Sequence, residues 1–168
     1  MIETDRLLLR PWSEEDAEAL FKYASDPRVS ELALWPCHTS VDMSREVIRR
    51  FFIPNQPTLA MELKSTGEPI GCIGLVPMCE EHYTPLTGER EIGYWIGHPH
   101  WSKGLTTEAL MAFTPYCFNE MGLNSLLITT DRKNTGSQRV AEKCGFSLID
   151  RYVCDGIASL AFRLRQTQ

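Results

Sequence analysis

Residues 91–107 run Glu91-Ile-Gly-Tyr-Trp-Ile-Gly-His-Pro-His-Trp-Ser-Lys-Gly-Leu-Thr-Thr107, and this order predicts a strand, a tight loop and a helix. Aromatic and β-branched side chains favour a strand from Glu91 to Gly97, and Pro99 ends it because proline cannot donate to a ladder. From Leu105 onward, apolar residues recur with the spacing of one helix face.

The loop between this strand and this helix has the chemistry of a phosphate site. A helix N-terminus leaves about four backbone N–H groups without intrahelical partners and carries partial positive charge. Gly104 has no Cβ to keep a ligand away from those groups. The side chains that could add donors are Ser102, Lys103, Thr106 and Thr107. An ordinary βα turn is the alternative, and neither the P-loop nor the dinucleotide fingerprint occurs at this turn.

The composition is that of one soluble globular domain. The chain has 168 residues, 43% hydrophobic and 23% charged, so we expect a single domain, residues 1–168, with a sizeable core. A net charge of −5 argues against a nucleic-acid surface. No apolar run approaches the roughly 18 residues that span a membrane, and the charged start has no secretory pattern. Six scattered cysteines without C-x-x-C favour free thiols in a reducing cytoplasm.

The rest of the chain predicts a mixed α/β order. The expected elements are a strand (4–12), a helix capped by Ser13 and stopped at Asp26-Pro27, an irregular segment (29–38), a helix capped by Ser40, a hairpin (57–64 and 69–76), a long loop (78–90), the strand and helix above, a strand (125–131), a helix (134–145) and a final hairpin (147–154 and 157–164). The strand 125–131 follows a helix, so we expect it to lie parallel to 91–97.

Two details refine this prediction. In the second helix, one apolar side is expected to hold Val47, Ile48, Phe51 and Phe52. In the first hairpin, glycines at 71 and 74 indicate a bulge or a close backbone approach. The resulting order is β-α-α-β-β-β-α-β-α-β-β, which is an α/β domain with a mixed sheet.

This order and several motifs resemble the GCN5-related N-acetyltransferase (GNAT) family across nearly the whole chain. The motifs are Thr4-Asp-Arg-Leu-Leu-Leu-Arg-Pro11 followed by Asp16 and Asp26-Pro27, then Glu91-Ile-Gly-Tyr-Trp-Ile96, Gly104, Glu108-Ala109, and Asn134 with Ser137 through Gly145-Phe146. They look like those of the branch that acetylates ribosomal-protein N-termini (RimJ/RimL type). The resemblance implies an α/β fold, layered as α+β, with helices on both faces of a mixed sheet whose parallel strands four and five splay apart. It also implies acetyl-CoA as co-substrate and no metal.

The resemblance assigns a cofactor site. The family's pyrophosphate signature has Gln or Arg three residues before a glycine and Gly or Ala two residues after it. Trp101 and Thr106 depart from that pattern, the branch often has Gly where Ser102 stands, and the central Gly104 is kept. The residues implied to hold the pyrophosphate are Ser102, Lys103, Gly104, Leu105, Thr106 and Thr107. Those implied to hold pantetheine are Trp95, Ile96 and Gly97, through their backbone, and Asn134.

Acetyl transfer needs a neutral amine, a polarised thioester carbonyl and a stabilised thiolate. A backbone N–H on the central strand could polarise the carbonyl. Glu91 is the first candidate for the general base, acting through water, because it lies in step with Gly93 and Trp95 on the strand. An ordinary solvent-facing strand residue is the alternative. Glu89 and Glu62 are further candidates for the base.

Two more polar residues carry expectations. Ser137 is the candidate that donates a hydrogen bond to the departing sulfur, and its alternative is a first-turn helix residue that satisfies backbone N–H groups. Glu108 lies in the first turn of a helix, where a carboxylate complements the helix dipole, so we expect it to be structural. For Arg139 and Lys143, the resemblance implies an approach to the nucleotide 3′-phosphate, and the alternative, which is the commoner role of such residues, is a solvated helix face.

The predicted function is transfer of an acetyl group from acetyl-CoA to a primary amine by direct attack on the thioester. The resemblance points to a peptide or protein N-terminal α-amine; the alternatives are a small-molecule amine (polyamine, amino acid or aminoglycoside) and a non-catalytic acyl-CoA-binding domain. The expected acceptor walls are residues 29–38, the second helix, the loop 78–90 and the hairpin around Asp155-Gly156. They carry Glu31, Asp42, Glu80, Glu81, Glu89 and Asp155, with Leu34 and Trp35 as apolar contacts.

The net charge and the absence of a long apolar run also restrict the classes of partner that we expect. We expect no nucleic-acid or membrane partner, and either a monomer or a homodimer. His98, His100 and His82 have no carboxylate or cysteine beside them with metal-ligand spacing, so a surface-loop role is expected rather than a metal site.

Overall fold

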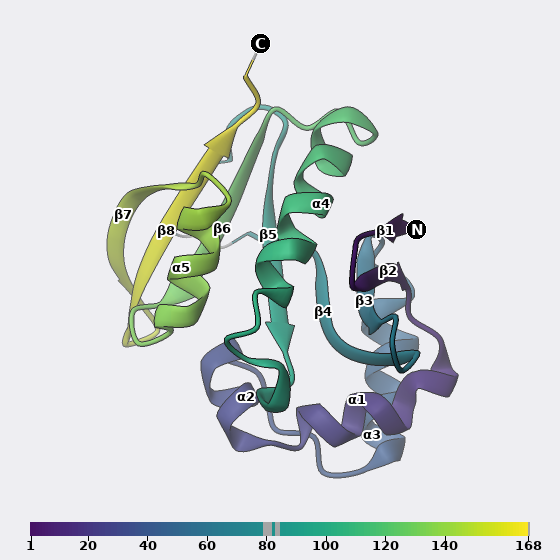
Figure 1. Cartoon of the computed structure of the whole chain (residues 1–168). Coiled ribbons are helices and arrows are strands. Elements are labelled where there is room, and N and C mark those ends of the chain that lie inside the picture. The colour runs from purple at the N-terminus through teal and green to yellow at the C-terminus, as the bar shows by residue number, and fades with distance from the viewer. Residues whose placement is uncertain (79–81, 83–84, 168) are drawn as a thin grey trace. The chain divides into compact units, whose positions relative to one another are not determined.

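The computed structural model describes residues 1–78, 82 and 85–167, and Figure 1 shows its course. The strands are β1 (Ile2–Glu3), β2 (Leu7–Pro11), β3 (Thr58–Leu63), β4 (Glu68–Val76), β5 (Glu89–Ile96), β6 (Ser125–Asp131), β7 (Ser147–Cys154) and β8 (Ile157–Arg165). The α-helices are α1 (Ala17–Ala24), α2 (Pro27–Ala33), α3 (Val41–Val47), α4 (Leu105–Asn119) and α5 (Thr135–Lys143). Short turns of helix are η1 (Glu14–Asp16), η2 (Ile48–Phe52) and η3 (His98–His100).

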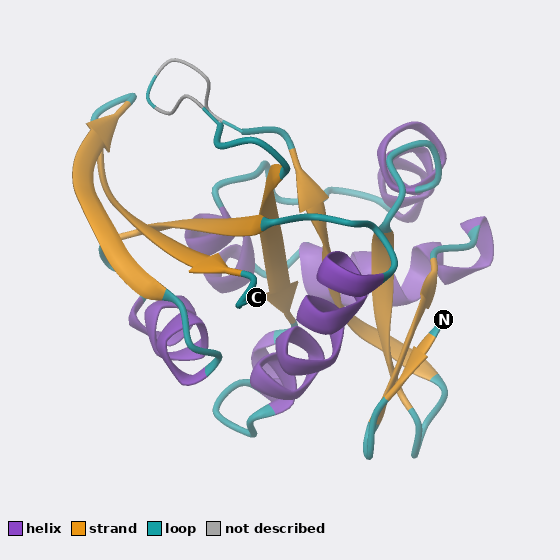
Figure 2. Cartoon of the chain, turned by 90° about the horizontal axis from the view of Figure 1, so that it is seen from above, coloured by secondary structure: helices purple, strands orange, loops and turns teal. Residues whose placement is uncertain are grey.

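The strands form one mixed sheet in the order β1-β2-β3-β4-β5-β6-β8-β7, with β5 and β6 parallel, which confirms the predicted α/β class. The chain groups into two compact units. The first unit is Met1–Gly74 with Tyr94–Ala109, and the second unit is Leu75–Gly93 with Leu110–Gln168. Figure 2 distinguishes their helices and strands by colour. No helix in the described part of the chain is long and apolar enough to cross a membrane.

The first unit has its core between the N-terminal strands and α1. Leu7 and Leu9 are fully buried on alternate positions of β2, which pairs antiparallel with β3. The buried cluster beside them comprises Trp12, Ala17, Leu20, Ala24, Ile48, Ala60 and Cys72. Ala17, Leu20 and Ala24 follow one face of α1, and burial of such an apolar stripe supplies most of a helix's stability.

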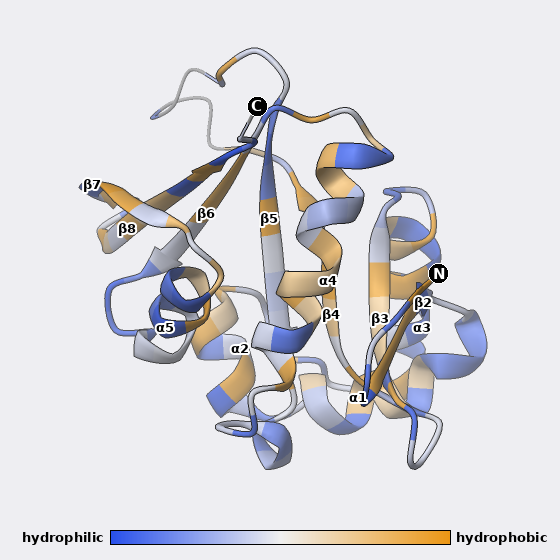
Figure 3. Ribbon diagram, turned by 45° about the horizontal axis from the view of Figure 1, so that its top comes forward, coloured by the Kyte–Doolittle hydropathy of each residue, from blue (hydrophilic) through white to orange (hydrophobic). Residues whose placement is uncertain are grey.

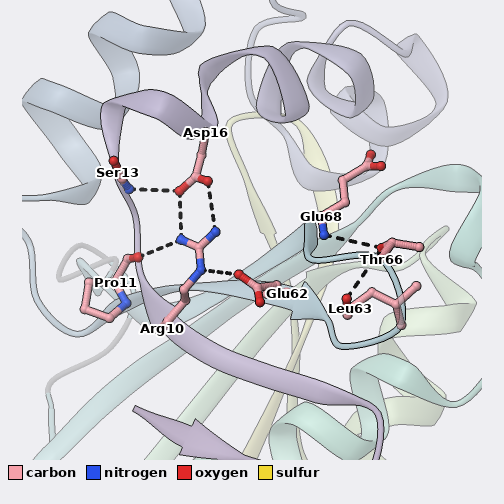
Figure 4. Close-up of polar contacts among 8 residues, drawn as sticks. All are labelled: Arg10, Pro11, Ser13, Asp16, Glu62, Leu63, Thr66 and Glu68. Carbon is pink, nitrogen blue, oxygen red and sulfur yellow. Dashed lines mark hydrogen bonds and ion pairs between the residues drawn. The ribbon is translucent and has the colours of Figure 1, made fainter.

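Arg10 connects three elements of the first unit (Figure 4). Its Nε donates to Glu62 Oε2 on β3 at 2.5 Å, while Nη1 and Nη2 donate to the two Asp16 oxygens at 2.8 and 2.9 Å. Asp16 also accepts from the Ser13 N–H at 2.9 Å, and together with the Ser13 side chain this completes the predicted capping box. A planar guanidinium suits this arrangement because its donors form a fixed fork.

Two predictions in the first unit are wrong. Residues 29–38 are not wholly irregular, because α2 begins at Pro27 with Asp26 as its N-cap, whose side chain accepts from the Arg28 N–H at 3.0 Å. Asp26-Pro27 ends one helix and starts the next, since Asp favours the N-cap and proline favours the first helical position. Phe51 is 58% exposed, because η2 is a π-helical turn and changes the face on which successive residues lie.

The first hairpin is confirmed and its glycines are explained. β3 pairs antiparallel with β4, and a register shift lies at Met61 and Glu62. A Cβ on Gly71 would lie 2.5 Å from Trp95 O, and one on Gly74 would lie 2.7 Å from Pro57 O. Backbone therefore approaches both glycines too closely for a side chain.

The second unit holds β6, β7, β8, α5 and the first part of β5. β6 pairs antiparallel with β8 from Ser125↔Arg165 to Asp131↔Ser159, and β8 pairs with β7. Asp155 and Gly156, with φ of 50° and 75°, form the turn of the predicted final hairpin. Ala141 is the buried residue of α5, and Figure 3 colours most of this helix as hydrophilic.

Candidate active site

The loop of residues 101–107 has the backbone that the sequence predicted. Gly104 has a φ of +74°, and a Cβ there would meet only Arg6 Nη2, at 3.6 Å, so the space beside it is open. The Glu108 N–H donates to Gly104 O at 3.0 Å, so the N–H groups of residues 105–107 precede the helical ladder of α4. These N–H groups and the helix dipole favour an anion at this position.

The side chains of this loop differ in their exposure to solvent. Ser102 and Lys103 are exposed, and Thr106 and Thr107 are partly buried. Leu105 is 3% exposed, so it could contribute only its backbone to a ligand. Ser102 has a φ of +59°, a left-handed conformation that glycine adopts more easily than serine.

The end of β5 already uses some of its polar groups. The Gly97 N–H donates to Ile70 O on β4 at 2.8 Å, and Ile96 O accepts from Trp101 Nε1 at 2.9 Å. Trp95 packs against the buried core, and its ring meets Trp35 edge-on at 5.7 Å between centroids. If this backbone pairs with pantetheine amides, it does so through groups other than the Gly97 N–H and Ile96 O.

Glu91 lies on the part of β5 that belongs to the second unit. It is 7% exposed, so the solvent-facing alternative is wrong. Burial raises the pKa of this carboxyl from 4.5 to about 7, and the hydrogen bond from Thr129 Oγ1 to Glu91 Oε1, at 2.5 Å, acts in the opposite direction. A carboxyl with this pKa exchanges protons near neutral pH.

The strand pair around Glu91 opens at this residue. The parallel ladder joins Glu89↔Ser125, Arg90↔Leu126 and Glu91↔Leu127, and β6 continues to Asp131 beyond its last paired residue. Thr129 lies in that continuation, so its contact with Glu91 is made just past the end of the ladder. This agrees with the predicted splay of the two parallel strands.

The other two candidate bases are held in ion pairs. Glu89 accepts from Arg163 Nε at 2.7 Å and from Ser125 Oγ at 2.6 Å. Burial raises the pKa of Glu89, but the hydrogen bonds from Arg163, Ser125 and the Leu86 N–H outweigh it, so the pKa is lowered. Glu62 is bonded to Arg10 (Figure 4). The lowered pKa makes Glu89 less suited than Glu91 to accept a proton, and the Glu62 carboxylate is already engaged by a guanidinium.

Asn134 and Ser137 lie together at the start of α5. Asn134 is the N-cap, and its side-chain oxygen accepts from the Ser137 N–H at 3.1 Å. Ser137 is therefore a partly buried first-turn residue whose backbone receives the cap. The catalytic role of its hydroxyl and the pantetheine contact of Asn134 remain predictions.

Comparison with known proteins places the chain in a family. A family model described as an acetyltransferase (GNAT) domain matches residues 6–147. The chain belongs to the GNAT acetyltransferase family. The uncharacterized N-acetyltransferase p20 of Bacillus licheniformis is 31% identical over 147 residues, which cover 85% of this chain and 80% of p20. The chain is accordingly an acetyl-CoA-dependent N-acetyltransferase.

Two further GNAT proteins extend the comparison. YdaF of Bacillus subtilis, which is provisionally named a ribosomal N-acetyltransferase, is 39% identical over 149 residues, covering 84% of this chain and 78% of YdaF. The crystal structure of a GNAT-family acetyltransferase from Bacillus anthracis matches with a TM-score of 0.82 over 98% of this chain and 97% of that one, at 24% identity. The second likeness shows the shared fold.

The expected acceptor walls of this GNAT enzyme are only partly described. Leu34 is 52% exposed at the end of α2, Trp35 is partly buried, and Asp155 is exposed in the β7–β8 turn. Glu31 and Asp42 are exposed in the first unit. Glu80 and Glu81 lie outside the described residues.

The histidines have neighbours other than metal ligands. His100 Nε2 lies 3.2 Å from the Tyr23 hydroxyl, and His98 packs on Trp101. His82 stacks on Tyr152, and its Nε2 lies 3.1 Å from the Asp150 carboxylate, so it has one carboxylate neighbour. Among residues 1–78, 82 and 85–167, no group of three or more His, Cys, Asp or Glu side chains could hold a metal ion.

Two contacts of the candidate site were not predicted from the sequence. Thr129 is one of several hydroxyl residues in its strand, and only the β5–β6 register identifies it as the partner of Glu91. Trp101 occupies the position where the family has Gln or Arg. All three side chains can donate a hydrogen bond, and this shared ability could have predicted the bond from the Trp101 indole N–H to Ile96 O.

Proposed function

We propose that this enzyme transfers the acetyl group of acetyl-CoA to the α-amine at the N-terminus of a peptide or protein. Residues 1–168 would act as one N-acetyltransferase domain, since the family match runs through residues of both units. The observation that carries the proposal is the buried Glu91 carboxyl, because its pKa of about 7 suits a base that works at neutral pH.

A side chain or backbone group of the enzyme is proposed for each step of the reaction. The neutral amine nitrogen attacks the thioester carbonyl carbon, and its surplus proton passes through water to the Glu91 carboxylate. The C–S bond then breaks, giving an amide and the CoA thiolate. A backbone N–H of β5 polarises the carbonyl oxygen, and Ser137 donates a hydrogen bond to the departing sulfur. Burial of Glu91 makes its carboxylate a stronger base than it would be in water.

The loop of residues 102–107 supplies the proposed acetyl-CoA contacts. The open space beside Gly104 and the N-terminus of α4 fit a pyrophosphate. Lys103 is exposed and adds a positive charge there. The backbone of Trp95, Ile96 and Gly97 and the side chain of Asn134 are proposed to contact the pantetheine arm.

Proton transfer favours an α-amine over a lysine side chain. An α-ammonium has a pKa of about 7.7–8.0, so moving its proton to a base with a pKa of about 7 costs only about 1 kcal/mol. A lysine ammonium with a pKa near 10.4 would cost about 5 kcal/mol. The resemblance to YdaF supports the same acceptor class.

The acceptor is tested with matched peptides. We expect CoA release with short peptides that have a free N-terminus, and none when the same peptides are N-acetylated but keep an internal lysine. Equal rates on both peptides would contradict the α-amine. Turnover only with a polyamine, amino acid or aminoglycoside would show that the acceptor is a small-molecule amine instead. Tight acetyl-CoA binding without turnover on any amine would indicate a binding domain.

The donor site is tested separately at Gly104. Gly104→Asp adds a negative charge beside the proposed pyrophosphate, and Asp tolerates a left-handed conformation better than most residues. We expect the acetyl-CoA affinity to fall by at least about 100-fold, or about 3 kcal/mol, with the fold intact. Gly104→Asn adds the same bulk without the charge and should lose less affinity. Calorimetry that gives wild-type affinity for Gly104→Asp would refute the phosphate site.

A further inference from the structure

The N-terminal segment holds the start of α4. Thr4 Oγ1 and the Arg6 N–H both donate to Glu108 Oε1, at 2.6 and 2.8 Å, and Arg6 Nε donates to Glu108 Oε2 at 2.7 Å. Burial raises the pKa of Glu108, but the hydrogen bonds from Thr4 and Arg6 outweigh it, so the pKa is lowered. Glu108 is thus a structural residue, as predicted, and it fixes the Arg6 guanidinium rather than only complementing the helix dipole.

Arg6 extends this contact to the loop. Its Nη1 donates to Lys103 O at 2.9 Å, and its own backbone carbonyl accepts from the Lys64 N–H at 2.9 Å. Arg6 is therefore anchored at three points. Its backbone is bonded to the sheet, and its side chain is bonded to Glu108 of α4 and to the Lys103 carbonyl of the loop. Its Nη2 also lies 3.6 Å from the position that a Cβ on Gly104 would occupy.

The bond to the Lys103 carbonyl decides where the Gly104 N–H points. In a trans peptide the C=O and N–H point in opposite directions, so the Gly104 N–H is directed away from Arg6. Ser102 and Gly104, with φ of +59° and +74°, lie on either side of Lys103, and glycine gives the backbone freedom to change at this point. If this peptide flipped, the Lys103 oxygen would replace an N–H donor, and an oxygen would repel a phosphate.

We propose that Arg6 is a positioning residue for the pyrophosphate of acetyl-CoA: its guanidinium holds the Lys103 carbonyl and so keeps the Gly104 N–H turned toward the phosphate. The inference rests on the proposed phosphate role of residues 102–107. Arg6 acts through the peptide and not by contact with the reacting atoms. A lysine cannot replace it, because a single ammonium lacks the planar fork that reaches a carboxylate and a carbonyl together.

The test compares two acetyl donors. S-acetyl-pantetheine carries the thioester but no pyrophosphate, whereas acetyl-CoA carries both. For Arg6→Lys we expect the KM for acetyl-CoA to rise about tenfold with kcat unchanged, as for the loss of one hydrogen bond to a charged group. The kcat/KM for S-acetyl-pantetheine should not change. A residue that merely stabilised the fold would lower activity with both donors.

A matched control lies on the same N-terminal segment. Arg10 also bridges the carboxylates of Glu62 and Asp16 and donates to Pro11 O, and within the described residues these hydrogen bonds reach no residue of the loop. Arg10→Lys should therefore leave the ratio of kcat/KM for the two donors unchanged. Glu108→Gln frees the Arg6 guanidinium and should shift the ratio in the same direction as Arg6→Lys. The double variant should be little worse than either single variant, because both changes break one network.

The outcomes separate this inference from the proposed function. If Gly104→Asp abolishes acetyl-CoA binding but Arg6→Lys and Glu108→Gln keep the wild-type donor ratio, the positioning role is refuted and the phosphate site stands. If Gly104→Asp binds acetyl-CoA normally, the phosphate site itself fails. A donor ratio that changes for Arg6→Lys and Glu108→Gln but not for Arg10→Lys supports the inference. An equal change for Arg10→Lys overturns it.

Discussion

Replacing Glu91 with glutamine removes a proton acceptor and little else. The glutamine Oε1 can still accept from Thr129 Oγ1, which lies 2.5 Å from the corresponding glutamate oxygen. Glutamine has the same length as glutamate, so it fits the surroundings in which Glu91 is 7% exposed. The variant therefore isolates the ability of residue 91 to ionise from its packing.

The expected loss of rate depends on pH. A lost general base typically costs about 10²–10⁴-fold in kcat. With a pKa of about 7, Glu91 is about one tenth ionised at pH 6 and about nine tenths ionised at pH 8, so the wild-type rate rises as the pH increases through 7. The acceptor amine titrates in both enzymes. The ratio of the two rates therefore isolates Glu91, and it should rise about tenfold between pH 6 and pH 8.

The same substitution should stabilise the protein. Burial raises the folded-state pKa of Glu91 from 4.5 to about 7, so the folded state binds more protons than the unfolded state between these pH values, and stability falls as the pH rises. Above pH 7 the cost of the buried charge levels off at about 3 kcal/mol. Glutamine carries no charge, so Glu91→Gln does not incur this cost. We expect its free energy of unfolding to exceed that of the wild type by up to about 3 kcal/mol at pH 8 and to match it near pH 4.5.

The assay pairs steady-state rates with denaturant unfolding across this pH range. Glu89→Gln is the control, because Glu89 is buried two residues earlier on β5 but is paired with Arg163. Breaking a buried ion pair leaves Arg163 without its counter-charge, so Glu89→Gln should destabilise the protein by about 3 kcal/mol. Its rate should keep the wild-type pH dependence. A Glu91→Gln variant with the wild-type pH–rate profile, or with lower stability at pH 8, would refute the assignment.

Three further substitutions test neighbouring groups. Thr129→Val removes the hydrogen bond that lowers the pKa of Glu91, so the rise of kcat with pH should move to higher pH; an unmoved profile contradicts this contact. Ser137→Ala should lower kcat less than Glu91→Gln, because a thiolate is already a fair leaving group; a change confined to the melting temperature indicates a structural role. Ser102→Gly relieves a left-handed serine and should raise the unfolding free energy by up to about 1 kcal/mol with acetyl-CoA affinity retained, which chemical denaturation and calorimetry check.

Local patterns predicted most of the fold. The cap at Ser40, whose side chain accepts from the Met43 N–H at 3.0 Å, needs only a few neighbouring residues, as does the turn at Asp155-Gly156. The strand at Ser125–Asp131 and its parallel partner follow from the intervening helix. The two-residue strand β1 and the seven-residue helix α2 were missed, because segments this short carry little periodicity.

The candidate site needed information that the sequence does not carry. Glu89 and Glu91 are equally spaced on one face of β5, and both are buried. Glu89 is paired with the Arg163 guanidinium on β8, whereas Glu91 accepts from the Thr129 hydroxyl on β6, so their pKa values move in opposite directions. These partners lie more than 35 residues away in the chain. The register of three strands decides which carboxyl contacts the guanidinium and which contacts the hydroxyl.

Two of the departures from the family signature, at Trp101 and Ser102, come with contacts to neighbouring elements. Trp101 replaces a Gln or Arg, yet its indole N–H still donates, to Ile96 O, and so anchors the start of the loop to β5. Ser102 replaces a residue that is often Gly in this branch, yet it adopts the left-handed conformation at a cost of about 1–2 kcal/mol. That cost is met because Arg6 fixes the next carbonyl and Glu108 fixes Arg6. A loop held at both ends by neighbouring elements can keep its shape while its own residues change, and in this loop Gly104 keeps a φ of +74° although the sequence signature is weakened.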